Sequence, residues 1–362
     1  MSPRERFQAL MHFEKVDVTP FYNLEGITEQ AVRRWCKEGF PIGVRAEDYF
    51  DFDNDLIITL DEGPIPSFIP KTIQEDKIWR TFVDRYGFKV KVSKESAVSP
   101  TVYYYLGGSI TSPDDWERMK KRYNPHDVRR YPKYWGEEFF EYCRSVSCPV
   151  RLWLYWGPGR AIKNGYMMGL EKFLESLYSQ PDLIHDMFNF WADFMIELVR
   201  EVVQKGKVDY AFIVEDGLAY KNSTIISPRI YREFWLSPVK KVIDFLRDNG
   251  IDIIGFYSSG NIRPLIPAML EAGFNLFAPL ECAAGMNAVE LRKEYGRKIL
   301  LMGNISREAL MRDKEAIKKE VLSKVPHLIN QGGYIPALDD MVLPDISFEN
   351  YVYYVDLIRS LL

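Results

Sequence analysis

The stretch that decides the fold is Tyr210-Ala211-Phe212-Ile213-Val214-Glu215-Asp216-Gly217, in which five apolar residues end at two acids and a glycine. A short apolar run of this kind, rich in β-branched and aromatic side chains, is typical of a strand buried on both faces of a parallel sheet. Residues 184–202, just before it, place apolar side chains at three- and four-residue steps, which predicts an amphipathic helix. The sequence therefore indicates a fold in which helices and strands alternate.

The same pattern, an apolar run that ends in polar residues, recurs along the chain. Because parallel neighbours need a crossover connection, this alternation favours a parallel sheet. Closure of eight strands predicts an α/β fold of the (β/α)8 TIM-barrel type, and an open doubly wound sheet is the alternative. The barrel is favoured because no Gly-x-Gly-x-x-Gly dinucleotide motif follows the first strand. The eight predicted strands are Val18–Leu24, Leu56–Leu60, Val150–Trp156, Tyr210–Val214, Ile251–Tyr257, Phe274–Leu280, Ile299–Met302 and Tyr334–Leu338.

One connection, between the second and third strands, is far longer than the others and is predicted to be an insertion, residues 64–149. Within it, Ile78–Val83 and Phe88–Val92 flank a turn that contains a glycine, which predicts a β-hairpin. Residues 114–123 and 135–144 have helical spacing. We therefore expect a single domain over the whole chain, whose inserted hairpin and helices shape or cover a site at the barrel mouth.

The composition excludes several classes of protein. The 47 Lys and Arg residues are outnumbered by 51 Asp and Glu residues, so there is no basic surplus for nucleic-acid binding. No apolar stretch reaches the roughly 18 residues that a membrane helix needs, and the charged N-terminus lacks the apolar core of a signal peptide. Four scattered cysteines give no disulfide framework, so we expect a cytoplasmic protein. The 14% aromatic content indicates either a bulky core or a cavity walled with rings.

In a barrel of this class the site lies at the carboxyl ends of the strands, and here these ends are rich in acids. Like charges held close together raise at least one pKa, which provides a general acid near neutral pH. We expect Glu215 and Asp216 to be catalytic, with one of them facing the mouth and Tyr257 within hydrogen-bond distance of it. The alternative is that these acids cap helices or hold loops. Residues expected to bind substrate at the strand ends are Glu25, Trp156, Arg160, Ser259, Asn261, Glu281, Asn304, Asp339 and Asp340.

The sequence lacks the usual spacings of a transition-metal site. It contains no Cys-x-x-Cys, His-x-Cys or His-Glu-x-x-His motif, and a thiolate or imidazole zinc site is therefore not expected. Only Cys282 among the cysteines follows a predicted strand, and a lone buried cysteine is usually a small apolar residue. A metal site made of carboxylates, from Glu215, Glu281 and Asp339 or Asp340, stays open.

Six short motifs lie in order over nearly the whole chain: Ser2–Phe7, Ile226–Pro228, Tyr257–Asn261, Leu280–Met286, Gly303–Ile305 and Gly332–Pro336. Together they resemble the uroporphyrinogen decarboxylase and corrinoid methyltransferase superfamily. The resemblance implies a (β/α)8 barrel, in agreement with the strand count. It also places Asp61 where the family's catalytic aspartate lies, and so implies a catalytic role for Asp61.

The first predicted strand distinguishes the branches of that superfamily. True uroporphyrinogen decarboxylases carry an arginine-rich stretch, Pro-x-Trp-x-Met-Arg-Gln-Ala-Gly-Arg, which binds the carboxylates of the porphyrinogen. The matching residues here, Pro20–Gly26, contain no arginine and one acid, Glu25. Placing a polycarboxylate substrate beside Glu25, Glu62 and Glu215 would cost free energy. The resemblance to the haem-pathway enzyme itself is therefore disfavoured.

The methyltransferase branch moves methyl groups to or from cobalamin carried by a small corrinoid protein. Its thiol-activating members bind zinc through His-x-Cys and a later Cys, whereas the matching residues here are Tyr257-Ser258-Ser259, and no cysteine follows Cys282. The resemblance therefore implies demethylation of a small methyl ether or a methylamine, and an aromatic pocket would suit an aryl ether. Its partners would be the methyl donor and the corrinoid protein, and a homodimer stays open.

Two other functions are compatible with the sequence. One is a decarboxylase or lyase that acts on a smaller carboxylic acid, with Arg160 binding the carboxylate. The other is a non-enzymatic barrel that binds a tetrapyrrole or cobalamin and passes it on.

Purified protein is expected to contain well under one equivalent of zinc, because the zinc-binding motif is missing, and chelators should not unfold it. Elemental analysis, together with thermal melts in the presence and absence of EDTA, measures both properties. Stoichiometric zinc or a chelator-induced loss of folding would contradict this expectation and would point to the carboxylates and Cys282 as ligands.

Overall fold

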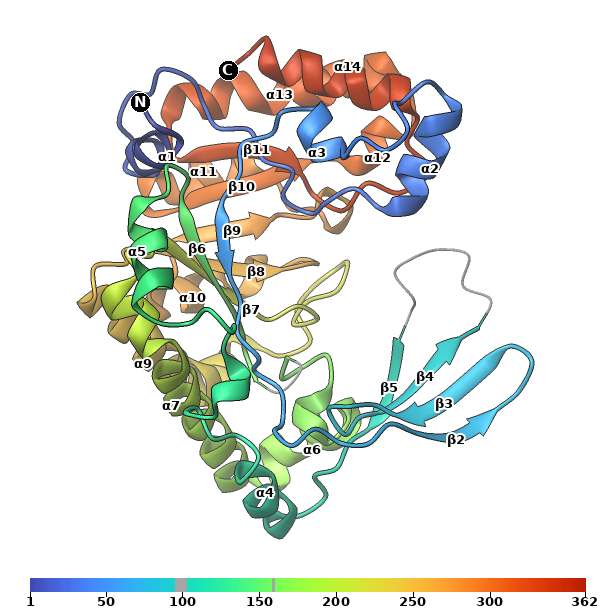
Figure 1. Cartoon of the computed structure of the whole chain (residues 1–362), viewed down its shortest axis with the longest axis vertical. Coiled ribbons are helices and arrows are strands. Elements are labelled where there is room, and N and C mark those ends of the chain that lie inside the picture. The colour runs from blue at the N-terminus through green and yellow to red at the C-terminus, as the bar shows by residue number, and fades with distance from the viewer. Residues whose placement is uncertain (95–102, 158–159) are drawn as a thin grey trace.

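A curled sheet of seven parallel strands forms the centre of the fold (Figure 1). The computed structural model describes residues 1–94, 103–157 and 160–362 of the chain. Neighbouring strands pair in parallel, for example with Tyr210 opposite Ile253 and Val214 opposite Tyr257. In spatial order the strands are β1 (Leu56–Ile58), β6 (Val150–Tyr155), β7 (Tyr210–Val214), β8 (Ile253–Ser258), β9 (Leu276–Pro279), β10 (Leu300–Ile305) and β11 (Tyr334–Leu338).

Seven of the eight predicted strands are thus confirmed, but the predicted first strand, Val18–Leu24, is wrong. Pro20 has no N–H for a ladder, and Phe21 pairs instead with the loop before β1. The Phe21 N–H donates to the Asp53 carboxylate at 2.9 Å, and the Asp53 N–H donates to the Phe21 carbonyl at 3.0 Å. The described residues therefore form an open half-barrel, and no eighth strand among them completes the barrel that we expected.

Alternate residues of each strand face two separate apolar cores. On β7, Phe212 and Val214 face one core, whereas Ala211 and Ile213 belong to the core shared with the helices. The first of these cores includes Phe7 of α1 (Pro3–Met11). The rings of Phe7 and Tyr210 lie 4.5 Å apart, so α1 packs at the amino end of β7.

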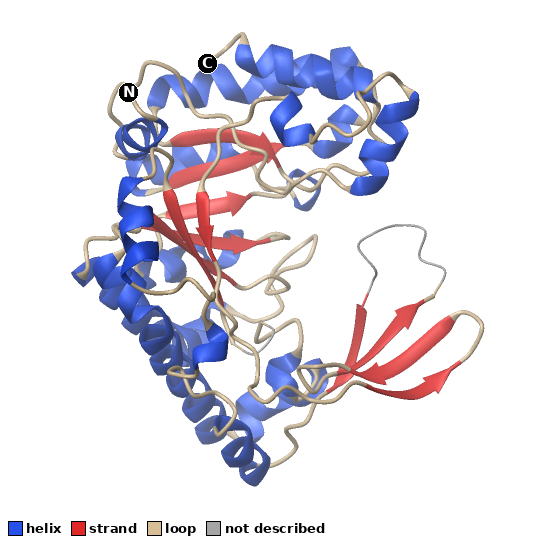
Figure 2. Cartoon of the chain, viewed as in Figure 1, coloured by secondary structure: helices blue, strands red, loops and turns tan. Residues whose placement is uncertain are grey.

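Helices cover the outer side of the seven-stranded sheet (Figure 2). The helix predicted over residues 184–202 is confirmed as part of α7, which buries its apolar stripe against the sheet. Besides α1, the α-helices are α2 (Glu29–Lys37), α3 (Ala46–Tyr49), α4 (Pro113–Lys120), α5 (Glu137–Ser145), α6 (Leu170–Ser179), α7 (Pro181–Lys205), α8 (Pro228–Ile230), α9 (Leu236–Asp248), α10 (Ile266–Ala272), α11 (Ala288–Tyr295), α12 (Arg307–Leu310), α13 (Lys314–Gln331) and α14 (Phe348–Arg359). A π-helix spans Tyr231–Trp235, and short 3-10 helices span Val128–Arg130, Gly165–Met167, Arg263–Leu265, Cys282–Ala284 and Gly296–Lys298.

Between β1 and β6 the chain forms a second, antiparallel sheet, which we call the arm. The predicted hairpin is confirmed as its two central strands, in which Thr81 lies opposite Lys91. In Figure 1 the arm stands apart from the seven-stranded sheet, on the side toward which the arrowheads of β8 to β11 point. The strands of the arm are β2 (Lys71–Glu75), β3 (Trp79–Val83), β4 (Lys89–Ser93) and β5 (Tyr103–Gly107).

A buried ion pair fastens α1 to the amino end of the sheet. The Arg4 guanidinium lies 2.8 Å from the Asp209 carboxylate, and each residue is 7% exposed. Arg4 also donates to the Cys143 carbonyl at 2.9 Å, and Asp209 accepts the Val150 N–H at 2.7 Å. The pair therefore joins α1 and α5 to the start of β6 and β7.

Asp209→Asn is expected to lower the free energy of unfolding by about 3–5 kcal/mol, because it leaves the Arg4 charge buried without its counter-ion. Urea unfolding followed by circular dichroism measures the change. The control is Asp17→Asn, which removes the exposed partner of Arg6 on the same helix and should cost at most about 1 kcal/mol. Equal effects of the two variants would show that the buried pair does not fasten α1.

Candidate active site

A pocket of about 750 Å³ lies between the arm and the loops that follow β1 and β6. Its volume is in the range of sites that bind small organic molecules. Charged side chains from the two loops and from the arm line it together with aromatic rings. The high aromatic content thus supplies a cavity wall as well as a core, and the rings are Phe82, Tyr86, Phe88, Tyr105, Tyr123 and Tyr155.

Glu62 is a partly buried acid in the lining of this pocket. Its two carboxyl oxygens accept the Tyr155 N–H at 3.2 and 3.1 Å. Burial raises the pKa of Glu62 to about 8, although the Tyr155 N–H and the Arg160 charge act in the opposite direction. Glu62 was not among the predicted site residues, and its position beside Asp61 at the end of a strand is the sequence signal that could have identified it.

Arg160 lines the same pocket on the loop after β6. Its guanidinium lies 4.7 Å from the centre of the Tyr155 ring and 3.4 Å from the Asp216 carboxylate. The turn that presents it needs Gly157, because a Cβ at this position, where φ is +70°, would lie 2.9 Å from the Tyr166 ring. Pro158 and Gly159, between Gly157 and Arg160, lie outside the described residues.

Asp216 is the inward-facing member of the predicted acid pair. It lies 2.9 Å from the Lys163 ammonium and 3.4 Å from Arg160. Burial opposes its ionisation, but the charges of Lys163 and Arg160 outweigh burial and hold the pKa of Asp216 below its ordinary value. Asp216 is therefore an ionised partner of two cations rather than a proton donor at neutral pH.

Glu215 points the other way, into the core between the sheet and the helices. It is 1% exposed and accepts the Ile162 N–H at 3.2 Å and the Trp235 indole N–H at 3.4 Å. Burial raises the pKa of Glu215 to about 8. Glu215, which we predicted to be catalytic, is not among the residues that line the pocket, and it binds the Ile162 N–H in the loop that carries Arg160.

Tyr257 donates a short hydrogen bond to Glu25, not to Asp216 as predicted. Burial raises the pKa of Glu25 to about 7, and the nearby charges of Asp340 and Asp216 add to the effect. Burial and the Glu25 charge likewise raise the pKa of Tyr257. The structure thus brings Glu25 and Tyr257 together as a hydrogen-bonded pair, close enough to Asp216 for its charge to act on Glu25.

Asp61, in the family's catalytic position by resemblance, lies at the rim of the pocket. Its carboxylate accepts the Gly63 N–H at 2.8 Å and lies 3.9 Å from the Arg85 guanidinium. Its side chain is 39% exposed. The geometry gives Asp61 a place in the lining, together with a role in the turn that follows β1.

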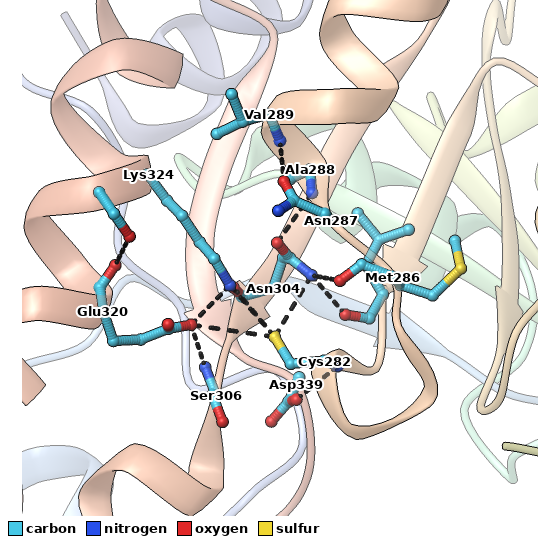
Figure 3. A network of polar contacts seen from close by, with 12 residues as sticks. Cys282, Met286, Asn287, Ala288, Val289, Asn304, Ser306, Glu320, Lys324 and Asp339 are labelled. Atoms are coloured by element: carbon cyan, nitrogen blue, oxygen red, sulfur yellow. Dashed lines mark hydrogen bonds and ion pairs between the residues drawn. The ribbon is translucent and has the colours of Figure 1, made fainter. Parts of the chain in front are cut away.

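Asn304 is a structural residue, not part of the substrate-binding surface that we predicted (Figure 3). It is completely buried, and its amide donates to the Leu280 carbonyl at 2.7 Å and to the Met286 carbonyl at 2.9 Å. Its side-chain oxygen accepts the Ala288 N–H at 2.8 Å. These bonds fix the loop after β9.

Asp339 and Cys282 belong to the same network (Figure 3). The Asp339 carboxylate accepts the N–H groups of Cys282 and Arg307, each at 2.8 Å, so Asp339 joins two loops. The Cys282 thiol lies 3.3 Å from the Lys324 ammonium, and Lys324 also pairs with Glu320. Burial raises the pKa of both Asp339 and Cys282, which disfavours thiolate chemistry.

Two further predicted residues hold the loop after β8 in place. The Glu281 carboxylate accepts the Gly260 N–H at 2.7 Å, and the Asn261 side chain accepts the Arg263 N–H at 3.1 Å. For these residues the alternative interpretation, that strand-end polar groups hold loops, describes the contacts that the structure contains.

Asp340 and Ser259 lie closer to the mouth. The Asp340 carboxylate accepts the Met341 N–H at 2.7 Å and adds to the field at Glu25. Ser259 is exposed, and its side chain is hydrogen-bonded to Asp216.

Trp156 lies outside the pocket, and its predicted role in substrate binding is corrected. It is 1% exposed and packs against Phe188 of α7 with ring centres 5.8 Å apart. Because Cβ atoms alternate along a strand, a residue one position past Tyr155 faces the helices rather than the pocket.

Two further observations concern metals and membranes. Within residues 1–94, 103–157 and 160–362, no group of three or more His, Cys, Asp or Glu side chains is arranged to bind a metal ion. Over the same residues, no helix has the length and apolar character required to cross a membrane.

Comparison with known proteins identifies the family. Residues 162–361, more than half of the chain, match the family model of uroporphyrinogen decarboxylase (URO-D). The chain belongs to the URO-D family. The uroporphyrinogen decarboxylase of Aliivibrio salmonicida is 24% identical over 209 residues, which are 55% of each chain, and that of Legionella pneumophila is 21% identical over 201 residues. The chain spans about half the length of these curated relatives, 55% and 54%.

The fold has a solved counterpart in a methyltransferase from Methanosarcina mazei. The two structures agree with a TM-score of 0.60 over 99% of this chain and 98% of that one, at 14% sequence identity. The likeness shows that the two chains share a fold.

The free energy of unfolding is expected to decrease as pH rises from about 5 to 8. In Glu215→Gln the decrease over the same range is expected to be smaller. Folding raises the pKa of Glu215 from 4.5 to about 8, so the folded chain binds a proton that the unfolded chain releases over this range. Urea unfolding at a series of pH values tests this, with Glu141→Gln on the exposed face of α5 as control. Parallel pH curves for wild type and Glu215→Gln would contradict the assignment.

Proposed function

We propose that this URO-D family member is a methyltransferase that demethylates a small methyl ether or methylamine, with the methyl group passed to cobalamin on a separate corrinoid protein. The observation that carries the proposal is a partly buried carboxylic acid with a raised pKa, Glu62, in an aromatic-walled pocket that Arg160 also lines. An acid held neutral in such a site is suited to protonate a leaving group.

The chemistry asked of this chain is the delivery of one proton. When the methyl group leaves an ether, the departing oxygen gains negative charge and needs a proton. With a pKa of about 8, the Glu62 carboxyl holds its proton at neutral pH and can give it to that oxygen. Tyr257 donates a hydrogen bond to Glu25 near the mouth, and this pair would supply a further proton to the site.

Cobalamin, when presented by its carrier, would supply the cobalt that accepts the methyl group. Phe82 and Tyr86 are only partly buried on the arm side of the pocket, and they would offer apolar surface to the flat ring of the corrin. We assign these rings to contact with the corrin. The remaining pocket residues would orient the methyl donor and exclude water from it.

The names of the relatives favour uroporphyrinogen as substrate, but the charges of the pocket argue against it. Asp61, Glu62 and Asp84 line the pocket with only two arginines, Arg85 and Arg160. A substrate with many carboxylates needs a clear excess of cations. A decarboxylase that acts on a small acid is the second candidate, since Arg160 can bind one carboxylate in the same pocket.

The test is demethylation of a panel of methyl ethers and methylamines with free cob(I)alamin, run beside a uroporphyrinogen assay. Glu62→Gln is expected to lower turnover by about 10²-fold because it removes the proton donor, and Tyr257→Phe should lower it by a smaller factor. Wild-type turnover should fall as pH rises through about 8, where Glu62 loses its proton. Glu141→Gln is the matched control.

Detectable formation of coproporphyrinogen at ordinary enzyme concentrations would overturn the methyltransferase assignment. Release of carbon dioxide from a small acid, with no methyl transfer across the panel, would favour the second candidate. Methyl transfer that is unchanged in Glu62→Gln would show that another group is the proton donor.

A further inference from the structure

We propose that the pocket selects an aromatic methyl donor that carries a carboxylate on its ring, and that Arg160 binds this carboxylate. The inference has two parts. That the ligand is a methyl donor rests on the proposed function, whereas the binding of an aromatic carboxylate depends only on the residues of the pocket. It narrows the substrate from any small methyl ether or methylamine to an anionic aryl methyl ether.

The walls of the pocket favour a planar ring. Phe88 and Tyr105 pack edge to face with their centres 5.7 Å apart, and Tyr86 lies 6.2 Å from Phe88. Tyr155 closes the opposite side beneath the Arg160 guanidinium. Aromatic side chains prefer offset or edge-to-face contact with another ring, so these walls offer several such contacts to an aryl substrate.

Most N–H groups of the Arg160 guanidinium make no hydrogen bond within the described residues and can bind an anion. A guanidinium carries five N–H groups, and within the described residues the Arg160 side chain makes one long hydrogen bond, 3.4 Å to Asp216. Asp216 is bound more closely by Lys163, at 2.9 Å, so the Arg160 charge is only partly compensated. Its side chain is 26% exposed and lies over the Tyr155 ring, with the guanidinium carbon 4.7 Å from the ring centre, so the exposed N–H groups can bind a carboxylate in bidentate fashion.

The acids that line the pocket have other hydrogen-bond partners and leave the Arg160 guanidinium able to bind an anion. Asp84 accepts the Tyr86 and Phe88 N–H groups, each at 2.9 Å, and Asp61 accepts the Gly63 N–H, so both carboxylates serve the backbone of turns. Glu62, which accepts the Tyr155 N–H, has a pKa raised by burial to about 8, which favours the neutral carboxyl at pH 7 and lets it donate a hydrogen bond. A cationic methylamine would instead meet the partly compensated charge of Arg160.

Equilibrium binding to the full chain, without cobalamin, tests the inference. Titration of 3-methoxybenzoate, benzoate, anisole and 3-methoxybenzylamine is followed by calorimetry. Both benzoates should bind at least 10-fold more tightly than anisole, and the amine should bind most weakly. Arg160→Gln should weaken benzoate binding by about 10- to 100-fold and leave anisole binding within about 2-fold.

Two further variants locate the effect. Arg160→Lys keeps the charge but loses the planar fork, and should restore part of the benzoate affinity. Arg232→Gln removes a positive charge that pairs with Glu271 on the helical surface, and should change no affinity. Loss of benzoate binding in Arg85→Gln but not in Arg160→Gln would overturn the assignment to Arg160.

The outcome separates this inference from the proposed function. Arg160-dependent binding of benzoates with no methyl transfer from methoxybenzoate would keep the inference and contradict the methyltransferase. Anisole or the amine binding as tightly as the benzoates would overturn the inference, even if methyl transfer is observed.

Discussion

The structure depends on the parallel pairing of its strands. Two neighbouring parallel strands must be joined by a crossover in which the chain returns to the end of the sheet where it started. All strands therefore begin at one end of the sheet and finish at the opposite, carboxyl end. The residues that follow β1, β6, β7 and β8 are therefore brought to one edge although they are far apart in sequence. Glu62, Arg160, Asp216 and Tyr257 come into proximity for this reason.

The three glutamates at this end of the sheet share a raised pKa but differ in their access to the pocket. Glu25, Glu62 and Glu215 all have a raised pKa because each is withdrawn from water. Their surroundings differ: Glu215 accepts two N–H groups in the core, Glu62 lines the pocket, and Glu25 accepts a hydrogen bond from Tyr257. A raised pKa alone does not identify a proton donor, because access to the pocket decides which acid can reach a substrate.

The arm forms one wall of the pocket at the carboxyl end of the seven-stranded sheet. Its strands contribute Phe82 and Tyr105, and its central turn contributes Tyr86 and Phe88, opposite the loop that carries Arg160. The strand ends supply charge and protons, whereas the arm supplies apolar surface. Members of one family that share the sheet can differ in substrate through such an insertion, since the chemistry of a site is set by the loops around a common scaffold.

The sequence by itself determined the alternation of strands and helices, the hairpin of the arm and the family, because apolar periodicity and short motifs are local properties of the chain. It also located the acids at strand ends. Only the tertiary structure decided that Val18–Leu24 forms no ladder, since Phe21 pairs with Asp53, distant in sequence. Likewise, Glu215 and Trp156 turned out to face the helices while Glu62 faces the pocket. A shift of one residue along a strand reverses the direction of a side chain, and the sequence does not specify the strand ends to that accuracy.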